Sequence, residues 1–437
     1  MHDLSRTFPL AVAASLALFA LPSPALAVQP PDIAELRARG PAALEELLSQ
    51  YDQTPPANRD GLAAVIDAVA GQRYATVSRL YWYTDLDRAE QAARQLHRPI
   101  LALRLLGDLR DDLSCANSRL FRATLYANTE VSAFLRSHFV LYWSTERAVP
   151  TVTIDFGDGR KIVRTTTGNS AHYVLDEDGR VLDVLPGLYA PAVFEQELKK
   201  SLAFADKIRG MAGWQRLGAV AAYHAAAIDA TDRAWQRAAD AQYLHGSQFL
   251  LSSGELASAL ARAQAATVSK MMIEVPDLRK IGMMSPGEIP NDAAMWSAIG
   301  QKVWNIVDHG TAPAQAPQAR GRGKPRVPAS MVLDAASRAL VAQLHNEGPA
   351  GQRATGAELD AVIARLEQHI VADTAQNQFT LRQTIRHQML EQPDADFATL
   401  NAWVYENVFA TPKADPWLGL VPRTEFTGLP GDGVVMP

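Results

Sequence analysis

The stretch from Leu113 to Arg119 reads LSCANSR and contains the only cysteine of this 437-residue chain. Cys115 is followed by Ser118, which stands where a dithiol redox motif has its second cysteine. A cysteine thiolate attacks disulfides, but without a second thiol it cannot resolve the mixed disulfide that it forms. A single cysteine also excludes any disulfide within the chain. Cys115 is therefore a candidate nucleophile for monothiol exchange, with glutathione or another external thiol completing each cycle.

The residues after Cys115 predict a helix over Ser118–His138, because their apolar side chains recur at helical spacing. A thiol at a helix start lies near unpaired backbone N–H groups, which stabilise an anion. We therefore expect Cys115 to be partly exposed and to have a lowered pKa. Arg119 would add to this effect, and Ser118 could donate a hydrogen bond to the sulfur. An inert, buried cysteine is the alternative, since free cysteines are often part of a core.

Ser170 and His172 are further candidate residues in the strand-like run SAHYVLD. They are two residues apart, so both side chains should lie on one face of a strand. If that face meets Cys115, His172 could form a Cys–His pair of the kind that activates a thiol. We favour the alternative, a histidine that is packed and hydrogen-bonded within the sheet, because buried polar groups normally find partners.

Other chemical signatures are missing from the sequence. The histidines are dispersed, and neither H-E-x-x-H nor C-x-x-C occurs, so we predict no metal site. Glycine-rich nucleotide motifs and the G-x-S-x-G motif are also missing, and we predict no cofactor. The formal net charge of −5 gives no reason to expect nucleic acid as a partner.

The elements that must position Cys115 form a predicted α/β block. Short apolar or alternating runs predict strands at Pro99–Gly107, His138–Glu146, 151–156, 161–166, 171–176 and 180–186. Helical spacing predicts helices at Asp85–His97, Ser118–His138 and Pro191–Ile208. Gly157-Asp158-Gly159 and Asp178-Gly179 separate successive strands and predict tight hairpins, because glycine accepts a positive φ.

This block resembles the secreted thioredoxin-like proteins. The resemblance rests on WYTDLDRAEQAARQLHRPILAL, the S-C-x-x-S segment, TEVSAFLRSHFVLYW and the final hairpin and helix, and it covers residues 76–205. It implies a thioredoxin-like fold, with Cys115 and Ser118 matching the two cysteines of the family's C-x-x-C motif. The chain departs from the family where Ser114 replaces a tryptophan and where the loop from Gly107 to Ser114 is longer. It also has Ser170 at the position of the family's cis-proline, and the bond before a serine should be trans.

The rest of the chain divides into further segments. Residues 1–27 have the charged start, apolar centre and small-residue end of a signal peptide, so we expect a periplasmic or secreted protein without a membrane span after cleavage. We expect a helical segment at 28–75, helical regions at 206–308 and 329–437, and a Pro/Gly-rich linker at 309–328. The chain closes in a Pro/Gly-rich strap that begins at Thr411.

Two functions follow from these observations. The first is monothiol thiol–disulfide exchange by Cys115 with Ser118 beside it, acting on protein thiols. The second is a non-catalytic interaction protein, in which a degenerate thioredoxin-like domain is a scaffold and the helical half binds a protein partner. An exposed Cys115 favours the first function, and a Cys115 covered by the C-terminal strap favours the second. The sequence names neither a substrate nor an oligomeric state.

Overall fold

The computed structural model describes residues 32–165, 168–241, 332–348, 353–409 and 411. The expected signal peptide at 1–27, the linker at 309–328 and the terminal strap beyond Thr411 lie outside these residues. Most of the predicted helical region at 206–308 also lies outside them.

The described chain begins with short helices that build a small core of their own. These are α1 (Ile33–Arg39), α2 (Pro41–Gln53), the 3-10 turn η1 (Pro56–Asn58), α3 (Asp60–Ala70) and α4 (Ala75–Ser78). Gly40 has a φ of 71° and separates α1 from α2, and Pro41 stands in the first turn of α2, where no helical partner for an N–H is needed. Leu44 and Leu48 pack with Ile66 and Tyr81. The elements from α1 to α3 lie within the segment 28–75, which was expected to be helical, and α4 starts at its last residue and continues to Ser78.

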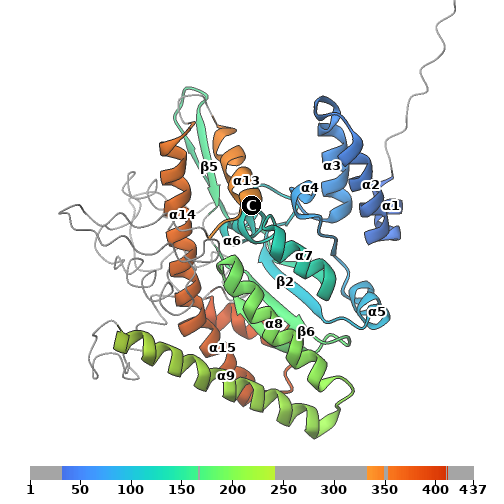
Figure 1. Ribbon diagram of the computed structural model, residues 1–437, viewed down its shortest axis with the longest axis vertical. Coiled ribbons are helices and arrows are strands. Elements are labelled where there is room, and N and C mark those ends of the chain that lie inside the picture. The colour runs from blue at the N-terminus through green and yellow to red at the C-terminus, as the bar shows by residue number, and fades with distance from the viewer. Residues whose placement is uncertain (1–31, 166–167, 242–331, 349–352, 410, 412–437) are drawn as a thin grey trace, which may run out of the picture. The chain divides into compact units, whose positions relative to one another are not determined.

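A mixed five-stranded sheet forms the centre of the α/β region (Figure 1). Its strands are β1 (Trp82–Tyr83), β2 (Ile100–Leu106), β3 (Val140–Arg147), β6 (Ala171–Leu175) and β7 (Val181–Pro186), in the order β1-β3-β2-β6-β7. The first three run parallel to one another, and β6 and β7 are each antiparallel to the preceding strand in that order. The predicted strands all occur, and the sequence missed only the two-residue β1.

Helices cover this sheet, which explains why its central strands are apolar on both faces. Every residue of β6 and β7 is buried, as in sheets that lack a solvated face. Helix α5 (Leu86–Leu96) contacts the three parallel strands, while α7 (Thr129–His138) contacts β3 and α8 (Pro191–Ile208) contacts β7. Helices α7 and α8 also contact each other (Figure 1). The Asp85 side chain caps α5 by accepting from the N–H of Arg88 at 2.9 Å.

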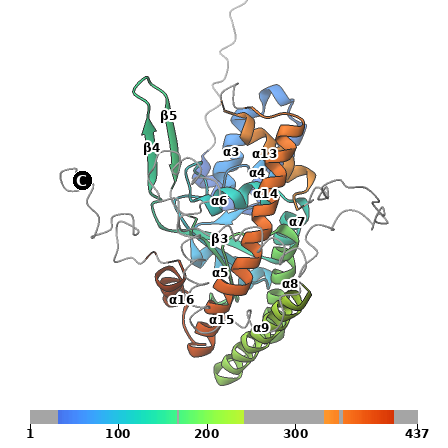
Figure 2. The same cartoon turned by 90° about the vertical axis from the view of Figure 1, so that its left-hand side faces the viewer.

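Two hairpins form at the predicted glycine turns. Strands β6 and β7 meet at Gly179, which has a φ of 77°. Strands β4 (Thr151–Asp155) and β5 (Lys161–Thr165) form a separate two-stranded sheet whose turn contains Gly157 and Gly159, both with positive φ. Both views show this second hairpin extending away from the five-stranded sheet (Figure 1, Figure 2).

The sequence predicts one continuous helix over Ser118–His138, and this prediction is wrong because the segment is divided. The segment contains α6 (Ala116–Leu120), the π-helical η2 (Phe121–Leu125) and then α7, which begins at Thr129. Asn128 has an extended backbone, and its side chain accepts from the N–H of Val131 at 3.0 Å. Such a cap starts a new helix, and it explains why a continuous apolar pattern spans separate elements.

The described residues of the second half are helical, as predicted. They form α9 (Gly213–Ala241), α13 (Ala335–Asn346), α14 (Ala357–Gln376), the π-helical η4 (Asn377–Leu381), α15 (Arg382–Glu391), α16 (Phe397–Trp403) and the π-helical η5 (Val404–Val408). Helix α15 contacts both α9 and β7. Apolar residues of these helices, including Ile370, Ile385 and Tyr405, share one buried cluster with residues of the sheet. Among the described residues, no helix combines the length and the apolar character needed to cross a membrane.

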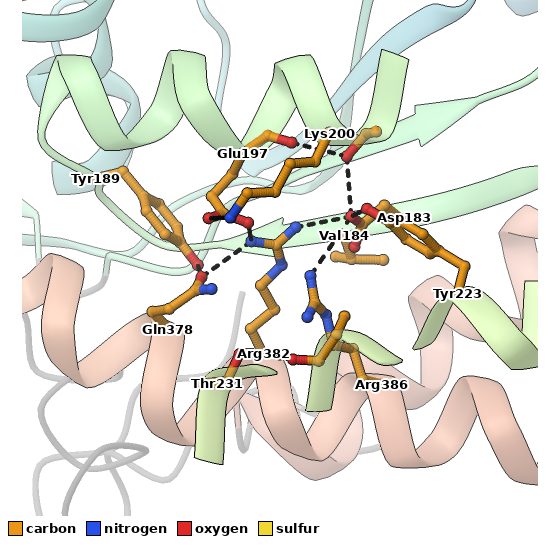
Figure 3. Close-up of polar contacts among 12 residues, drawn as sticks. Asp183, Val184, Tyr189, Glu197, Lys200, Tyr223, Thr231, Gln378, Arg382 and Arg386 are labelled. Atoms are coloured by element: carbon orange, nitrogen blue, oxygen red, sulfur yellow. Dashed lines mark hydrogen bonds and ion pairs between the residues drawn. The ribbon is translucent and has the colours of Figure 1, made fainter. Parts of the chain in front are cut away.

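A buried ionic network joins β7 and α8 to α15 (Figure 3). We define it as Asp183, Glu197, Arg382 and Arg386, none of which is more than 3% exposed. Arg382 lies 2.7 Å from the carboxylate of Asp183 and 2.8 Å from that of Glu197. The network therefore holds together residues that are 199 positions apart in the sequence.

Asp183 is the most heavily bonded member of this network. Its carboxylate accepts from the hydroxyl of Tyr223 at 2.7 Å and from that of Ser201 at 2.9 Å, in addition to Arg382. Burial alone would raise the pKa of Asp183, but Arg382 and Arg386 hold that pKa well below its usual value. The carboxylate is therefore ionised within a completely buried strand.

Candidate functional site

Cys115 stands at the junction between the central strand β2 and helix α6. It is the N-cap residue of α6, and its own N–H donates to the carbonyl of Leu106, at the end of β2, at 3.1 Å. The placement at a helix start is the one that the sequence predicts. The side chain, however, is completely buried within the main core cluster. The expectation of a partly exposed thiol is therefore wrong.

Ser118 and Ser170 both lie against the sulfur, so the structure brings together three of the five predicted residues. The Sγ atom of Cys115 is 2.9 Å from the Oγ of Ser170, which is 55 positions away in the sequence. The thiol also donates to the Oγ of Ser118 at 3.5 Å. The described chain contains no cis peptide bond, so the bond before Ser170 is trans, as predicted.

The hydroxyl of Ser118 donates its hydrogen bond to oxygen acceptors and not to the sulfur of Cys115. Its Oγ donates to the carbonyl of Cys115 at 2.8 Å and lies 2.7 Å from the Oγ of Ser114. The sequence analysis expects Ser118 to donate to the sulfur, and this direction is wrong. A hydroxyl has one proton, which here meets oxygen acceptors close at hand.

Arg122 is a residue of this site that the sequence analysis does not name. It is 2% exposed, donates to the carbonyl of Leu109 at 2.9 Å and to the Oγ of Ser114 at 3.2 Å, and faces the ring of Tyr74. Burial lowers its pKa. Arg122 thus ties the long loop between Gly107 and Ser114 to η2. Its position four residues after Ser118, on the same helical face, is the signal that could have found it.

Arg119 lies in the last turn of α6, four residues after Cys115. Its side chain is half-buried, and its backbone N–H donates to the carbonyl of Cys115 at 3.2 Å, as the first turn of a helix requires. The effect of its side chain on the thiol stays a prediction.

His172 is hydrogen-bonded within the core and does not pair with Cys115. It lies in β6 between Leu103 of β2 and Leu185 of β7, and its Nε2 is 2.7 Å from the hydroxyl of Tyr126. Phe121 and Phe194 pack against the ring. Within the described residues the ring makes no hydrogen bond to the thiol. The packed histidine that we favour from the sequence is confirmed.

Residues from the C-terminal part of the chain cover the strand end that carries Ser170. The hydroxyl of Tyr405 donates to the carbonyl of Asn169 at 3.2 Å, and the side-chain amide of Asn169 donates to the Oγ of Thr411 at 3.3 Å. Burial raises the pKa of Tyr405 well above its usual value, and the nearby Tyr173 and Cys115 add to this shift. The cover includes Thr411, the first residue of the expected strap, and the helical residue Tyr405, which the sequence analysis does not connect with Cys115.

A metal centre finds no support in the part of the chain that the structure describes, where no group of three or more His, Cys, Asp or Glu side chains could hold an ion. No protein-family model matches this chain, and no curated protein matches it.

The buried histidines predict a stability that falls with acid. Burial lowers the pKa of His172 to about 3 and that of His224 to about 4, whereas an unfolded histidine titrates near 6.5. Between these values the unfolded chain binds more protons, so stability is full above about pH 6.5 and decreases as the pH falls. We expect the free energy of unfolding to decrease by about 1.4 kcal/mol per pH unit for each histidine as the pH falls from about 6 to 4.

Urea unfolding of the full chain at several pH values measures this slope. In His172→Phe the slope should decrease by about the share of one histidine, because phenylalanine fits between Phe121 and Phe194 but does not titrate. His345→Gln is the control, because His345 is exposed and its replacement should leave the slope unchanged. An unaltered slope in His172→Phe would show that His172 is protonated in the folded protein.

Proposed function

We propose that this chain is a non-catalytic, thioredoxin-like scaffold that acts through interaction with a protein partner. The strand order β1-β3-β2-β6-β7, with three parallel strands followed by two antiparallel ones, supports a thioredoxin-like fold. The cysteine at the start of the helix after the central strand supports it as well. Residues 1–27 lead us to infer export to the periplasm or the medium, and this inference rests on the sequence alone.

The complete burial of Cys115 is the observation that carries this proposal. Thiol–disulfide exchange requires the thiolate to approach a disulfide sulfur directly, so rate depends on access as well as on ionisation. Here Ser170 and Ser118 contact the sulfur, and Tyr405 is among the nearby residues. No substrate sulfur can reach Cys115 unless this packing opens.

The arrangement of the cover also supports a scaffold role. In a thioredoxin-like domain the segment just before β6, which carries Ser170, would face the substrate, and here its neighbour Asn169 is bonded to Tyr405 and Thr411. The C-terminal helices thus occupy surface that an exchange enzyme would leave open. We infer that a partner is bound elsewhere, with the helical half of the chain as the candidate region.

A turnover assay separates this function from monothiol exchange. We expect the full-length protein to reduce a small disulfide with glutathione no faster than Cys115→Ala does, because the buried thiol does not enter the cycle. Alanine fills most of the space of a cysteine, and circular dichroism checks that the variant folds. A glutathione-dependent rate that is present in the wild type and lost in Cys115→Ala would reject the proposal in favour of monothiol exchange.

A further inference from the structure

A cavity of about 320 Å³ lies beside the ionic network, between α8, α9, η4 and α15. One wall consists of alanines of α9 together with Phe379. These alanines are Ala226, Ala227, Ala230 and Ala234. Cavities of this size hold small ligands, and they are usually apolar with a few polar groups that fix orientation. This cavity is independent of Cys115 and of the function proposed above.

Arg386 supplies the most unusual polar group of this cavity. It lines the cavity but is itself only 3% exposed, and its Nε atom makes no hydrogen bond within the described residues. Its one ion pair there is with Asp183 at 3.7 Å. That carboxylate is already bonded more closely by Arg382 and Tyr223, each at 2.7 Å. The guanidinium of Arg386 is therefore poorly compensated.

The charges around the cavity do not balance. Glu197 also lines it, but its two oxygens are taken by Lys200 at 2.6 Å and by Arg382 at 2.8 Å. The two buried carboxylates equal the two buried guanidinium groups in number, and Lys200, whose side chain is 55% exposed, adds one positive charge at the rim of the cavity. Within the network the close contacts all go to Arg382, so Arg386 is the cation without a close carboxylate. A buried charge without a partner is costly, so an anion that reaches Arg386 gains electrostatic energy.

Gln378 offers a second donor at the same place. Gln378 lines the cavity and its Oε1 accepts from Arg382 at 2.9 Å, so the amide Nε2 is the group that it can offer to a ligand as a donor. A carboxylate can accept from a guanidinium and an amide together. The alanine wall on α9 provides a smooth apolar surface next to these donors.

We propose that this cavity binds a small organic anion with one carboxylate and an unbranched apolar tail. The carboxylate lies against Arg386 and the amide of Gln378, and the tail follows the alanines of α9 towards Phe379. One poorly compensated guanidinium, that of Arg386, matches one carboxylate, and the apolar wall selects against ions without a tail, such as inorganic phosphate.

Calorimetric titration of the full-length protein with octanoate tests this proposal. We expect one octanoate to bind per chain, while octylammonium, which has the same tail and the opposite charge, does not bind. Arg386→Gln should weaken octanoate binding about tenfold or more, since it removes a charge-assisted contact. The variant retains Arg382 as the partner of both buried carboxylates, and its unfolding midpoint checks that it folds.

A matched pair of variants on α9 tests the position of the ligand without altering charge. Ala230→Trp should abolish octanoate binding by filling the cavity, whereas Ala225→Trp should preserve it. Both alanines are exposed on the same helix, but Ala225 does not line the cavity. The proposal is overturned if octanoate does not bind, if octylammonium binds equally well, or if binding survives in Ala230→Trp.

Discussion

Iodoacetamide should alkylate Cys115 in the native protein about a thousand times more slowly than in the unfolded chain, or more slowly still. The thiol is completely buried, so reagent reaches it only after local or global opening. An opening free energy of about 4 kcal/mol already gives this ratio, and globular proteins commonly exceed it. A thiol at a helix start would by itself react faster than a free thiol, and the burial of the Cys115 side chain reverses that expectation.

Mass spectrometry after timed alkylation measures both rates directly, because this chain has one cysteine and therefore one reactive thiol. Tyr405→Ala should accelerate the native reaction, since it removes the side chain that bonds to Asn169 in the cover. Tyr51→Ala serves as its control, because Tyr51 lies in α2 and packs in the separate N-terminal core. If the native protein were alkylated as fast as the unfolded chain, the thiol would be accessible, and this result would favour monothiol exchange as the function.

Arg382→Met should destabilise the protein by about 3–5 kcal/mol, the largest stability effect that we expect from one substitution. Methionine has a similar length and no charge, so Asp183 and Glu197 would remain buried as carboxylates without their close partner. Arg386 compensates only in part, because it lies 3.7 Å from Asp183. The free energy of unfolding in urea at pH 7 measures the effect.

Two further variants serve as controls for the effect of Arg382→Met on the free energy of unfolding. Arg233→Met removes an exposed ion pair with Asp229 on α9 and should change the free energy of unfolding by about 0.5 kcal/mol or less. The quadruple variant Asp183→Asn, Glu197→Gln, Arg382→Met, Arg386→Met should recover part of the loss, because it removes all four charges of the network and leaves none of them buried and unpaired. A loss below about 1 kcal/mol in Arg382→Met would show that water or Arg386 replaces the arginine.

The sequence by itself determined the local elements of the α/β region. Apolar runs such as Ile100–Leu106 form strands because their side chains can be buried on both faces of a sheet, and Gly179 permits the turn that pairs β6 with β7. The position of Cys115 at a helix start also follows from neighbouring residues alone. These features depend on interactions within a few residues along the chain, which is why patterns and spacing reveal them.

The tertiary structure alone decided whether the thiol is accessible. Tyr405 and Thr411, which cover the loop beside Ser170, lie more than two hundred positions away in the sequence, and no local pattern connects them with it. The partner of His172 is likewise set by tertiary packing, because Tyr126 lies 46 positions before it in the sequence. Burial and pairing of this kind depend on which distant segments pack together.

The residues of the ionic network are recognisable in the sequence one by one, but their pairing is not. Asp183 interrupts the apolar run VLDVLP, and a carboxylate in a buried strand requires a cation. Arg382 and Arg386 stand four residues apart, on one face of α15. The buried carboxylate and the pair of arginines can each be seen in the sequence, but the sequence does not show that they pair with each other. The ion pairs between them depend on the packing of α15 against β7. The sequence shows which charge needs a partner, and only the fold brings that partner within hydrogen-bond distance.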